Sequence, residues 1–311
     1  MKSLPLFRLA AVLAVPIVLA VAIFIVPSIG TSRAHLLKLT MIDVGQGDSI
    51  LLETPSGRSV LIDGGIATRG EHGVDYDSGA RVVVPFLRHE GLRRIDLVVA
   101  THPHADHVGG LATVLRTFRV GEVLDGDVLP YDDPVYVDFV AAERERRVAV
   151  RVARQGEHIA LGDGVTLDCL NPPVSGTPYG TDPNNDTMND YSAVFRVTYG
   201  KIHILLDGDA EANAERRMLK AFGASGIQAD ILKCGHHGSD NATTGEWLDA
   251  VRPAVALISC GVHNRYGHPG RHTLARLAVR NIRTLITARD GAVTVTTDGR
   301  TVSVQQERGG K

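Results

Sequence analysis

One stretch of the chain decides the fold: Thr101-His-Pro-His-Ala-Asp-His-Val-Gly-Gly110, directly after the apolar segment Ile95 to Ala100. Its core packs four metal-binding side chains into six positions: His102, His104, Asp106 and His107. Imidazole nitrogens suit zinc and related ions. A carboxylate among them adds an oxygen ligand of the kind that harder ions prefer, and such a mixed set differs from the closed coordination of a purely structural metal site. A strand that runs into such a loop and then into an apolar helix, expected over residues 111–118, holds ligands on a rigid edge with an open side. The pattern predicts a catalytic metal site.

A single histidine in a loop is usually no more than a residue satisfied by hydrogen bonds. That interpretation fails here because three histidines and one aspartate stand at alternating and adjacent positions, in a chain with 13 histidines in all. Their imidazolium forms would repel one another unless a cation held them as neutral donors. The set therefore favours metal binding.

The motif His-x-His-x-Asp-His is the signature of the metallo-β-lactamase-fold hydrolases, and the chain resembles that family. More narrowly, it resembles the nuclease-like domain of ComEC-type DNA-uptake competence proteins. This likeness rests on further segments that occur in the family's order and reach over nearly everything after residue 35: Met41-Ile-Asp-Val-Gly-Gln-Gly-Asp48, Leu61-Ile-Asp-Gly-Gly65, Leu205-Leu-Asp-Gly-Asp-Ala-Glu211, Leu232-Lys-Cys-Gly-His-His-Gly-Ser239 and Tyr266-Gly-His-Pro269. The resemblance implies a four-layer αββα sandwich with two divalent transition-metal ions, zinc or manganese, at one edge, and hydrolysis of phosphodiester bonds.

The resemblance also implies which residues hold the ions. The implied ligands form two sets with a bridging carboxylate between them: His102 with His104, Asp106 with His107 and His236, and Asp209 as the bridge. Asp209 follows an apolar strand, where a helix N-cap is the ordinary alternative, and the family's Gly-Asp position favours it over Asp207. His236 and His237 both follow the strand expected over residues 229–234. We expect His236 to bind metal and His237 to face the substrate or support a ligand.

The remaining implied residues act on the substrate. Asp106, His237 and His268 are the expected catalytic residues, with His268 as a substrate contact or general acid and a plain loop histidine as the alternative. The ions would lower the pKa of a bridging water and supply hydroxide, so no nucleophilic serine or cysteine is required. Substrate contacts are expected from four residues: Gln46, Asp48, Asn189 and Ser192.

The chain departs from the wider superfamily between the first motif and Asp209. Lactamase- and glyoxalase-like members place a further metal-binding histidine there, whereas this interval offers only His158 and His203, and neither fits. The ComEC-like branch has Asn-x-x-Ser instead, which Asn189 and Ser192 match. The difference weakens the alternative activity, hydrolysis of a cyclic amide or ester of the lactamase or lactonase type. A non-catalytic binding module that retains the fold is a third interpretation, and the intact ligand positions argue against it.

Composition agrees with one globular domain plus one extra element. With 311 residues, 44% of them apolar and 22% charged, the chain can bury a full core, which we assign to residues 33–311. A net charge of −2 creates no strong field toward a polyanion, so DNA as the phosphodiester substrate requires a local basic strip. The candidates for that strip are Arg81, Arg88, Arg93, Arg94, Arg265 and Arg271. No protein partner is predicted.

Residues 1–32 form the extra element. No charge occurs between Arg8 and Arg33, and residues 9–26 are an almost unbroken apolar run, long enough to span a bilayer. Lys2 and Arg8 precede this run, and positive charge on that side predicts a membrane anchor with the catalytic domain extracytoplasmic. Secretion after cleavage as a signal peptide is the alternative.

Coarser patterns predict the other elements. Strands are expected over residues 37–44, 49–53 and 59–63. Between residues 121 and 171 the pattern loosens into a candidate insert, with one helix and three strands: residues 134–147, 148–153, 159–161 and 165–170. The cluster Glu143-Arg-Glu-Arg-Arg147 is typical of a solvated helix face. The three cysteines are expected to be small buried hydrophobes and not a disulfide framework.

Overall fold

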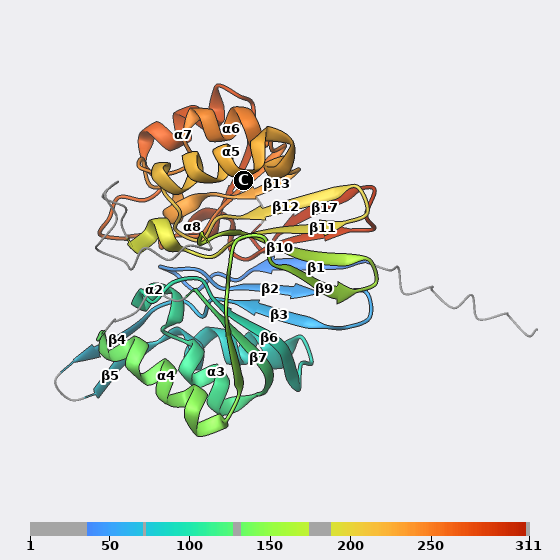
Figure 1. The fold of residues 1–311 in the computed structure, drawn as a ribbon. Coiled ribbons are helices and arrows are strands. Elements are labelled where there is room, and N and C mark those ends of the chain that lie inside the picture. The colour runs from blue at the N-terminus through green and yellow to red at the C-terminus, as the bar shows by residue number, and fades with distance from the viewer. Residues whose placement is uncertain (1–35, 71–72, 127–131, 174–187, 309–311) are drawn as a thin grey trace, which may run out of the picture. The chain divides into compact units, whose positions relative to one another are not determined.

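The fold is that of a computed structural model, which describes residues 36–70, 73–126, 132–173 and 188–308 (Figure 1). The anchor predicted over residues 1–32 lies outside these ranges. Within them, no helix is both long and apolar enough to cross a membrane.

The first sheet has the strand order β17-β16-β1-β2-β3-β6-β7-β8. Strand β1 pairs antiparallel with β2 and β16, whereas β3, β6, β7 and β8 run parallel to one another. The strands are β1 (Leu37–Met41), β2 (Ile50–Glu53), β3 (Ser59–Ile62), β6 (Arg94–Ala100), β7 (Arg119–Asp125), β8 (Ala149–Val152), β16 (Val293–Thr297) and β17 (Val302–Gln306).

The second sheet has the order β15-β14-β13-β12-β11-β10-β9. Strands β12 to β15 are parallel, and β9 to β12 form an antiparallel meander. The strands are β9 (His158–Gly162), β10 (Val165–Asn171), β11 (Val194–Tyr199), β12 (Ile202–Leu206), β13 (Ile231–Lys233), β14 (Val255–Ile258) and β15 (Arg283–Ile286).

The two sheets pack face to face with helices outside them, as predicted for an αββα sandwich (Figure 1). Apolar side chains of both sheets form the central core, among them Leu39, Leu52 and Val99 of the first sheet and Phe195 and Leu257 of the second. Helices α1 (Val84–His89), α3 (Leu111–Thr117) and α4 (Pro134–Arg146) cover the outer face of the first sheet. Helices α5 (Ala212–Ile227), α6 (Gly245–Val251) and α7 (Arg271–Ala278) cover the second. Alternating side-chain direction along each strand makes this arrangement, because one face of a strand enters the central core and, in the middle of each sheet, the other face meets a helix.

The segment predicted to be an insert is instead part of both sheets. The helix α4 and the strands β8, β9 and β10 form close to the expected positions, but β8 extends the first sheet and β10 pairs with β11 of the second. The hairpin of β4 (Ala67–Gly70) and β5 (Gly73–Asp77) was not predicted, because the β4 sequence has no apolar alternation and that of β5 is limited to two apolar residues, which is too short to indicate a strand. The cysteines are free and buried, as expected: Cys169, Cys234 and Cys260.

Parallel pairing brings chemistry-bearing loops to one edge. Strands β3 and β6 of the first sheet end just before Asp63 and Thr101, and strands β12, β13 and β14 of the second end just before Asp207, Cys234 and Ser259. Because parallel strands place their carboxyl ends at the same edge, the loops that follow them meet there.

The prediction that residues 143–147 of the sequence form a solvated helix face is wrong at Glu143, in helix α4. Arg144 and Glu145 are exposed, as a solvated face requires, but Glu143 is only 6% exposed. Burial, reinforced by the neighbouring Asp125 carboxylate, raises the pKa of Glu143 to about 8. The side chain is therefore neutral in the folded protein below that pH, where an exposed glutamate would be ionised.

The substitution Glu143→Gln should flatten the dependence of stability on pH. Because the pKa of Glu143 is about 8 in the fold against an ordinary value of 4.5, its contribution to stability is fully present below about pH 4.5 and is lost as the pH rises toward 8. Thermal unfolding between pH 5 and 8 measures the effect. The wild type should lose more stability over this range than the glutamine variant. Glu145→Gln, at an exposed position of the same helix, should follow the wild type; coinciding curves for wild type and Glu143→Gln would contradict the assignment.

Candidate metal centre

The loop after β6 is anchored by Asp63, at the end of β3. The Thr101 backbone N–H donates to Asp63 Oδ1 over 2.8 Å, and the Thr101 hydroxyl donates to Asp63 Oδ2 over 2.7 Å. The same Oδ2 lies 2.8 Å from His107 Nδ1. A carboxylate at Nδ1 fixes the ring and its tautomer, so Nε2 of His107 faces the centre of the site.

Asp209 stands where the two sheets meet, between β12 and α5. Glu211, and not Asp209, is the N-cap residue of α5, so the N-cap alternative does not hold. Four imidazole Nε2 atoms approach one oxygen of this carboxylate, Asp209 Oδ2, at 3.2, 3.4, 3.9 and 3.9 Å; they belong to His107, His237, His102 and His236, respectively. Asp207, the alternative to Asp209 in the same segment, accepts a hydrogen bond from Trp247 Nε1 instead. The geometry agrees with the choice of Asp209 as the shared carboxylate.

The adjacent histidines of the short helix η3 (Gly235–Gly238) point in different directions. Both residues have left-handed backbone conformations, with φ of 45° at His236 and 54° at His237. His237 is buried, with Nδ1 3.0 Å from the Ser259 carbonyl oxygen and Nε2 3.2 Å from Asp106 Oδ2. His236 is partly exposed, and its Nδ1 lies 2.8 Å from Glu211 Oε1. His237 Nε2 lies closer to Asp209 Oδ2 than His236 Nε2 does, at 3.4 against 3.9 Å, so the geometry favours His237 over His236 as the metal ligand.

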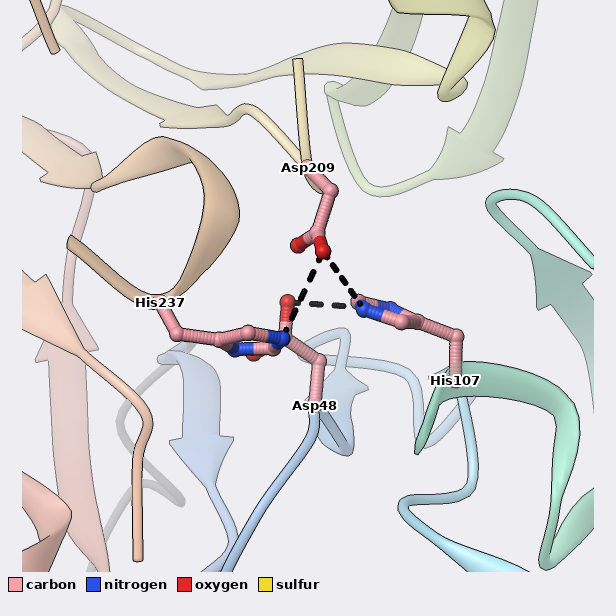
Figure 2. A group of neighbouring side chains, drawn as sticks. All are labelled: Asp48, His107, Asp209 and His237. Carbon is pink, nitrogen blue, oxygen red and sulfur yellow. Dashed lines mark ion pairs between the residues drawn. The ribbon is translucent and has the colours of Figure 1, made fainter. Parts of the chain in front are cut away.

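Four buried residues bring their ligand atoms within 4.8 Å of one another: Asp48, His107, Asp209 and His237. Figure 2 shows these side chains pointing toward one another from separate segments of the chain. The structure therefore supplies a group that fits a metal ion and includes Asp48, which the sequence interpretation placed against the substrate. Asp48 is 2% exposed and pairs with the Lys233 ammonium, so it belongs to the buried side of the centre.

The chemistry of these donors fits a divalent cation. Among the described residues, no hydrogen-bond partner reaches three buried atoms that face the group: His107 Nε2, His237 Nε2 and Asp209 Oδ1. Burial disfavours charge on both imidazoles, but the surrounding carboxylates together outweigh it. Asp209 with Asp48 and Asp106 raises the pKa of His237 to about 10, and Asp209 with Asp63 raises the pKa of His107 well above its usual value. Protons held this way are exchanged for a metal ion when it binds.

The other two histidines of the motif form a second set of donors. His102 Nε2 lies 2.9 Å from His104 Nδ1. Burial, with the neighbouring His107, lowers the pKa of both rings, so they are neutral and able to coordinate. The donors around Asp209 thus fall into the two groups that a pair of ions requires, with His237 in place of His236 in the second. Occupancy by two ions remains a prediction.

Two of the expected substrate contacts serve the centre indirectly. The Asp209 backbone N–H donates to Ser192 Oγ over 3.1 Å, and Ser192 is fully buried. Asn189 Nδ2 donates to Glu211 Oε1 over 3.1 Å and lies 3.3 Å from His236 Nδ1. The Asn-x-x-Ser segment therefore positions Asp209 and the Glu211–His236 pair. Neither residue lines the cavity described next.

A cavity of about 300 Å³ opens over the centre. Its lining combines metal-site side chains with loop residues: Gln46, His104, Ala105, Asp106, Asp133, Asp209, His236, His237, Tyr266 and His268. Gln46 and His268 thus both line the cavity, where a contact with substrate remains a prediction. Burial, and then the nearby His236 and His237, lower the pKa of His268 to about 4. A neutral ring favours the role of substrate contact over that of general acid near pH 7.

Lys233 is a functional residue that the sequence interpretation missed. Its ammonium is fully buried at the end of β13, pairs with Asp48, donates to the Gly208 carbonyl over 2.7 Å and lies 3.8 Å from Asp209 Oδ1. Burial opposes charge on this group, but Asp48 and Asp209 outweigh burial and raise the pKa of Lys233. The sequence contains one signal for this role, because a lysine ends an apolar strand just before Gly-His-His. Such a strand is buried, and a fully buried charge almost always has a partner of opposite charge.

Comparison with known proteins agrees with this geometry. Residues 42–263 match the family described as the metallo-beta-lactamase superfamily. The chain belongs to this superfamily. The third histidine of its lactamase-like members has no counterpart at the two candidate positions, since His158 is exposed beside Asp168 and His203 lies 3.1 Å from Thr198 Oγ1 on β12.

Within the metallo-β-lactamase superfamily, the chain is similar to ComEC-type competence proteins. It is 31% identical over 266 residues to ComE operon protein 3 of Bacillus subtilis, a match that covers 82% of this chain and 32% of the relative. It is 29% identical to competence protein ComA of Neisseria gonorrhoeae, over 82% of this chain and 31% of that protein. Recombination protein 2 of Haemophilus influenzae is 30% identical, over 86% of this chain and 30% of that protein. The chain spans about a third of the length of these relatives.

The substitution Lys233→Met should destabilise the metal-free protein strongly. Loss of the ammonium leaves Asp48 and Asp209 as buried charges without their cation, a change that costs about 3–5 kcal/mol in comparable pairs. Urea unfolding of the chelator-treated protein measures the loss. Lys38→Met is the matched control, because Lys38 pairs with Glu53 and Glu90 at a partly exposed position, and such pairs contribute only about 0–1 kcal/mol. Equal losses in the two variants would contradict the role of Lys233.

The two adjacent histidines should differ in metal retention. Because His237 Nε2 lies near both Asp106 and Asp209, His237→Ala should remove about one metal ion per chain or weaken its binding severely. His236→Ala should retain more metal, since the ring lies at the edge and contacts Glu211. Elemental analysis after dialysis against a weak chelator distinguishes them. Greater metal loss in His236→Ala than in His237→Ala would instead identify His236 as the ligand, as the sequence predicts.

Proposed function

We propose that the protein is a metal-dependent phosphodiesterase that acts on nucleic acid, most simply as a nuclease. The observation that carries this proposal is the convergence of four imidazole nitrogens on Asp209 Oδ2 at the floor of an open cavity. Metallo-β-lactamase membership supports metal-dependent hydrolysis. The likeness to two proteins named for competence and one named for recombination supports nucleic acid as the substrate.

Divalent ions bound here would supply Lewis acidity, lowering the pKa of water and offsetting charge on a phosphoryl oxygen. The chain's own residues prepare for that chemistry. Asp63 and the Ser259 carbonyl hold His107 and His237 by Nδ1, so each ring keeps its Nε2 toward the centre. Lys233 lies beside Asp209 Oδ1, which leaves Oδ2 as the oxygen shared by the imidazoles.

The cavity walls would bind the substrate. His268, which is neutral near pH 7, and Gln46 line the cavity and could contact a phosphodiester group above the centre. Asp106 also lines the cavity, and its Oδ2 lies 3.2 Å from His237 Nε2. Asp106 is therefore a candidate both for metal binding and for the catalytic role proposed for it.

We also propose, from the sequence alone, that residues 9–26 anchor the protein in a membrane with the hydrolase domain extracytoplasmic. Support comes from the uncharged apolar run and from Lys2 and Arg8 before it. The substrate would then be extracytoplasmic nucleic acid.

A substrate panel tests the activity. With added manganese or zinc, the protein should hydrolyse bis(p-nitrophenyl) phosphate and cleave DNA, and should leave β-lactams and lactones essentially untouched. Chelation should abolish turnover, and Asp209→Ala should do the same while the circular dichroism spectrum is retained, because Asp209 organises both donor groups. Faster turnover of a lactam or lactone at matched metal would overturn the proposal in favour of cyclic amide or ester hydrolysis.

A further inference from the structure

Arg265, in the loop between β14 and α7, brings positive charge to the mouth of the cavity. It belongs to a segment, from Cys260 to Arg289, that has six arginines, three histidines and no aspartate or glutamate. Three of these arginines have partners away from the cavity: Arg280 pairs with Asp249, Arg289 with Asp290, and Arg276 donates to backbone carbonyls. Arg265 differs, since its guanidinium donates to the hydroxyl of the cavity-lining residue Tyr266 over 2.9 Å.

A series of neighbouring rings, of which Tyr266 and His268 are stacked, connects this loop to the metal centre. The ring centroids of His237 and His268 are 6.0 Å apart, and those of His268 and Tyr266 are 5.7 Å apart with an interplanar angle of 23°. Tyr266 is 52% exposed, so its ring is accessible from the cavity mouth. The Arg265 guanidinium carbon lies 5.0 Å from the centroid of the Tyr266 ring.

The tip of the loop is held in place by its own hydrogen bonds. The His268 backbone N–H donates to Asn264 Oδ1 over 2.9 Å, and Asn264 Nδ2 donates to the His268 and Gly261 carbonyls over 2.7 and 2.9 Å. Gln46, on the facing loop, accepts from the Gly261 N–H over 3.4 Å. Arg265 and Tyr266 are therefore presented from a closed turn beside the centre.

We infer that Arg265 and Tyr266 form a subsite for the nucleotide that flanks the scissile phosphodiester, with Arg265 binding its phosphate and Tyr266 contacting its base. Proteins that bind single strands combine cationic side chains with aromatic platforms in this way. This inference rests on the proposed function and makes it more specific, because it assigns a polynucleotide strand as the substrate. Of the six arginines suggested by the sequence for a basic strip, Arg265 is the one whose partner lines the cavity.

The test compares two substrates on the full 311-residue chain. A single-stranded oligonucleotide engages the subsite, whereas bis(p-nitrophenyl) phosphate has no flanking nucleotide. Arg265→Ala and Tyr266→Ala should each lower the ratio of kcat/KM for the oligonucleotide to that for the small diester by about 5-fold or more. Tyr266→Phe, which keeps the ring, should retain most of the ratio. Arg265→Ala should also reduce the slope of log KM against log salt by about 0.7, the share of one single-strand phosphate contact.

Arg119→Ala is the matched control. Arg119 is an exposed arginine at the start of β7, which runs parallel to β6, so it lies at the sheet edge opposite the metal loop and roughly 20 Å from it. The ratio of kcat/KM values for this variant should equal that of the wild type. If Arg265→Ala and Tyr266→Ala behave like Arg119→Ala, or if the wild type cleaves only the small diester, the subsite inference is wrong while the proposed chemistry stands. If the wild type cleaves neither substrate with metal present, the proposed function itself fails.

Discussion

The metal centre depends on one carboxylate oxygen, Asp209 Oδ2, which receives imidazole nitrogens from both sheets. His102 and His107 approach it from the loop and short helix after β6, whereas His236 and His237 approach it from the turn after β13. The apolar core between the sheets sets the distance between these two groups. A tightly packed core cannot shift by an ångström without cost, so the packing of the sandwich is also what holds the ligands in place.

Burying this many ionisable groups is unfavourable unless each has a partner. The structure meets that requirement with a closed network in which Asp63 fixes His107, the Ser259 carbonyl fixes His237, Ser192 fixes the backbone of Asp209, and Lys233 offsets Asp48. The contacts leave the Nε2 atoms of His107 and His237 directed at the centre without hydrogen-bond partners among the described residues. Buried carboxylates and imidazoles are stable together only when their charges offset one another. This requirement explains why a lysine lies in the core beside the metal centre.

The floor and the mouth of the cavity are built differently. The floor consists of buried residues at strand ends, whose positions the two sheets determine. The mouth consists of loop residues such as Tyr266 and His268, which reach the cavity from a turn closed by Asn264. Chemistry placed on a rigid sheet edge with recognition on adjacent loops is the usual division of roles in layered α/β proteins.

Local patterns in the sequence were enough to predict the layered α/β class, the strands β1 to β3, the helix α4 and the run of candidate metal ligands from His102 to His107. Each of these depends on periodicity or on ligands that are close together in the chain, which neighbouring residues can reveal. Tertiary structure decided the rest. The left-handed backbone at His236 and His237 directs one ring inward and the other to the edge, and no spacing rule distinguishes two adjacent histidines. Ser192, Asp48 and Lys233 take their roles from partners far away in the chain, and the pairing of β16 with β1 joins segments more than 250 residues apart. Contacts of this kind form only when the sheets pack, because burial and charge pairing depend on the three-dimensional surroundings of a residue and not on its immediate neighbours in the sequence.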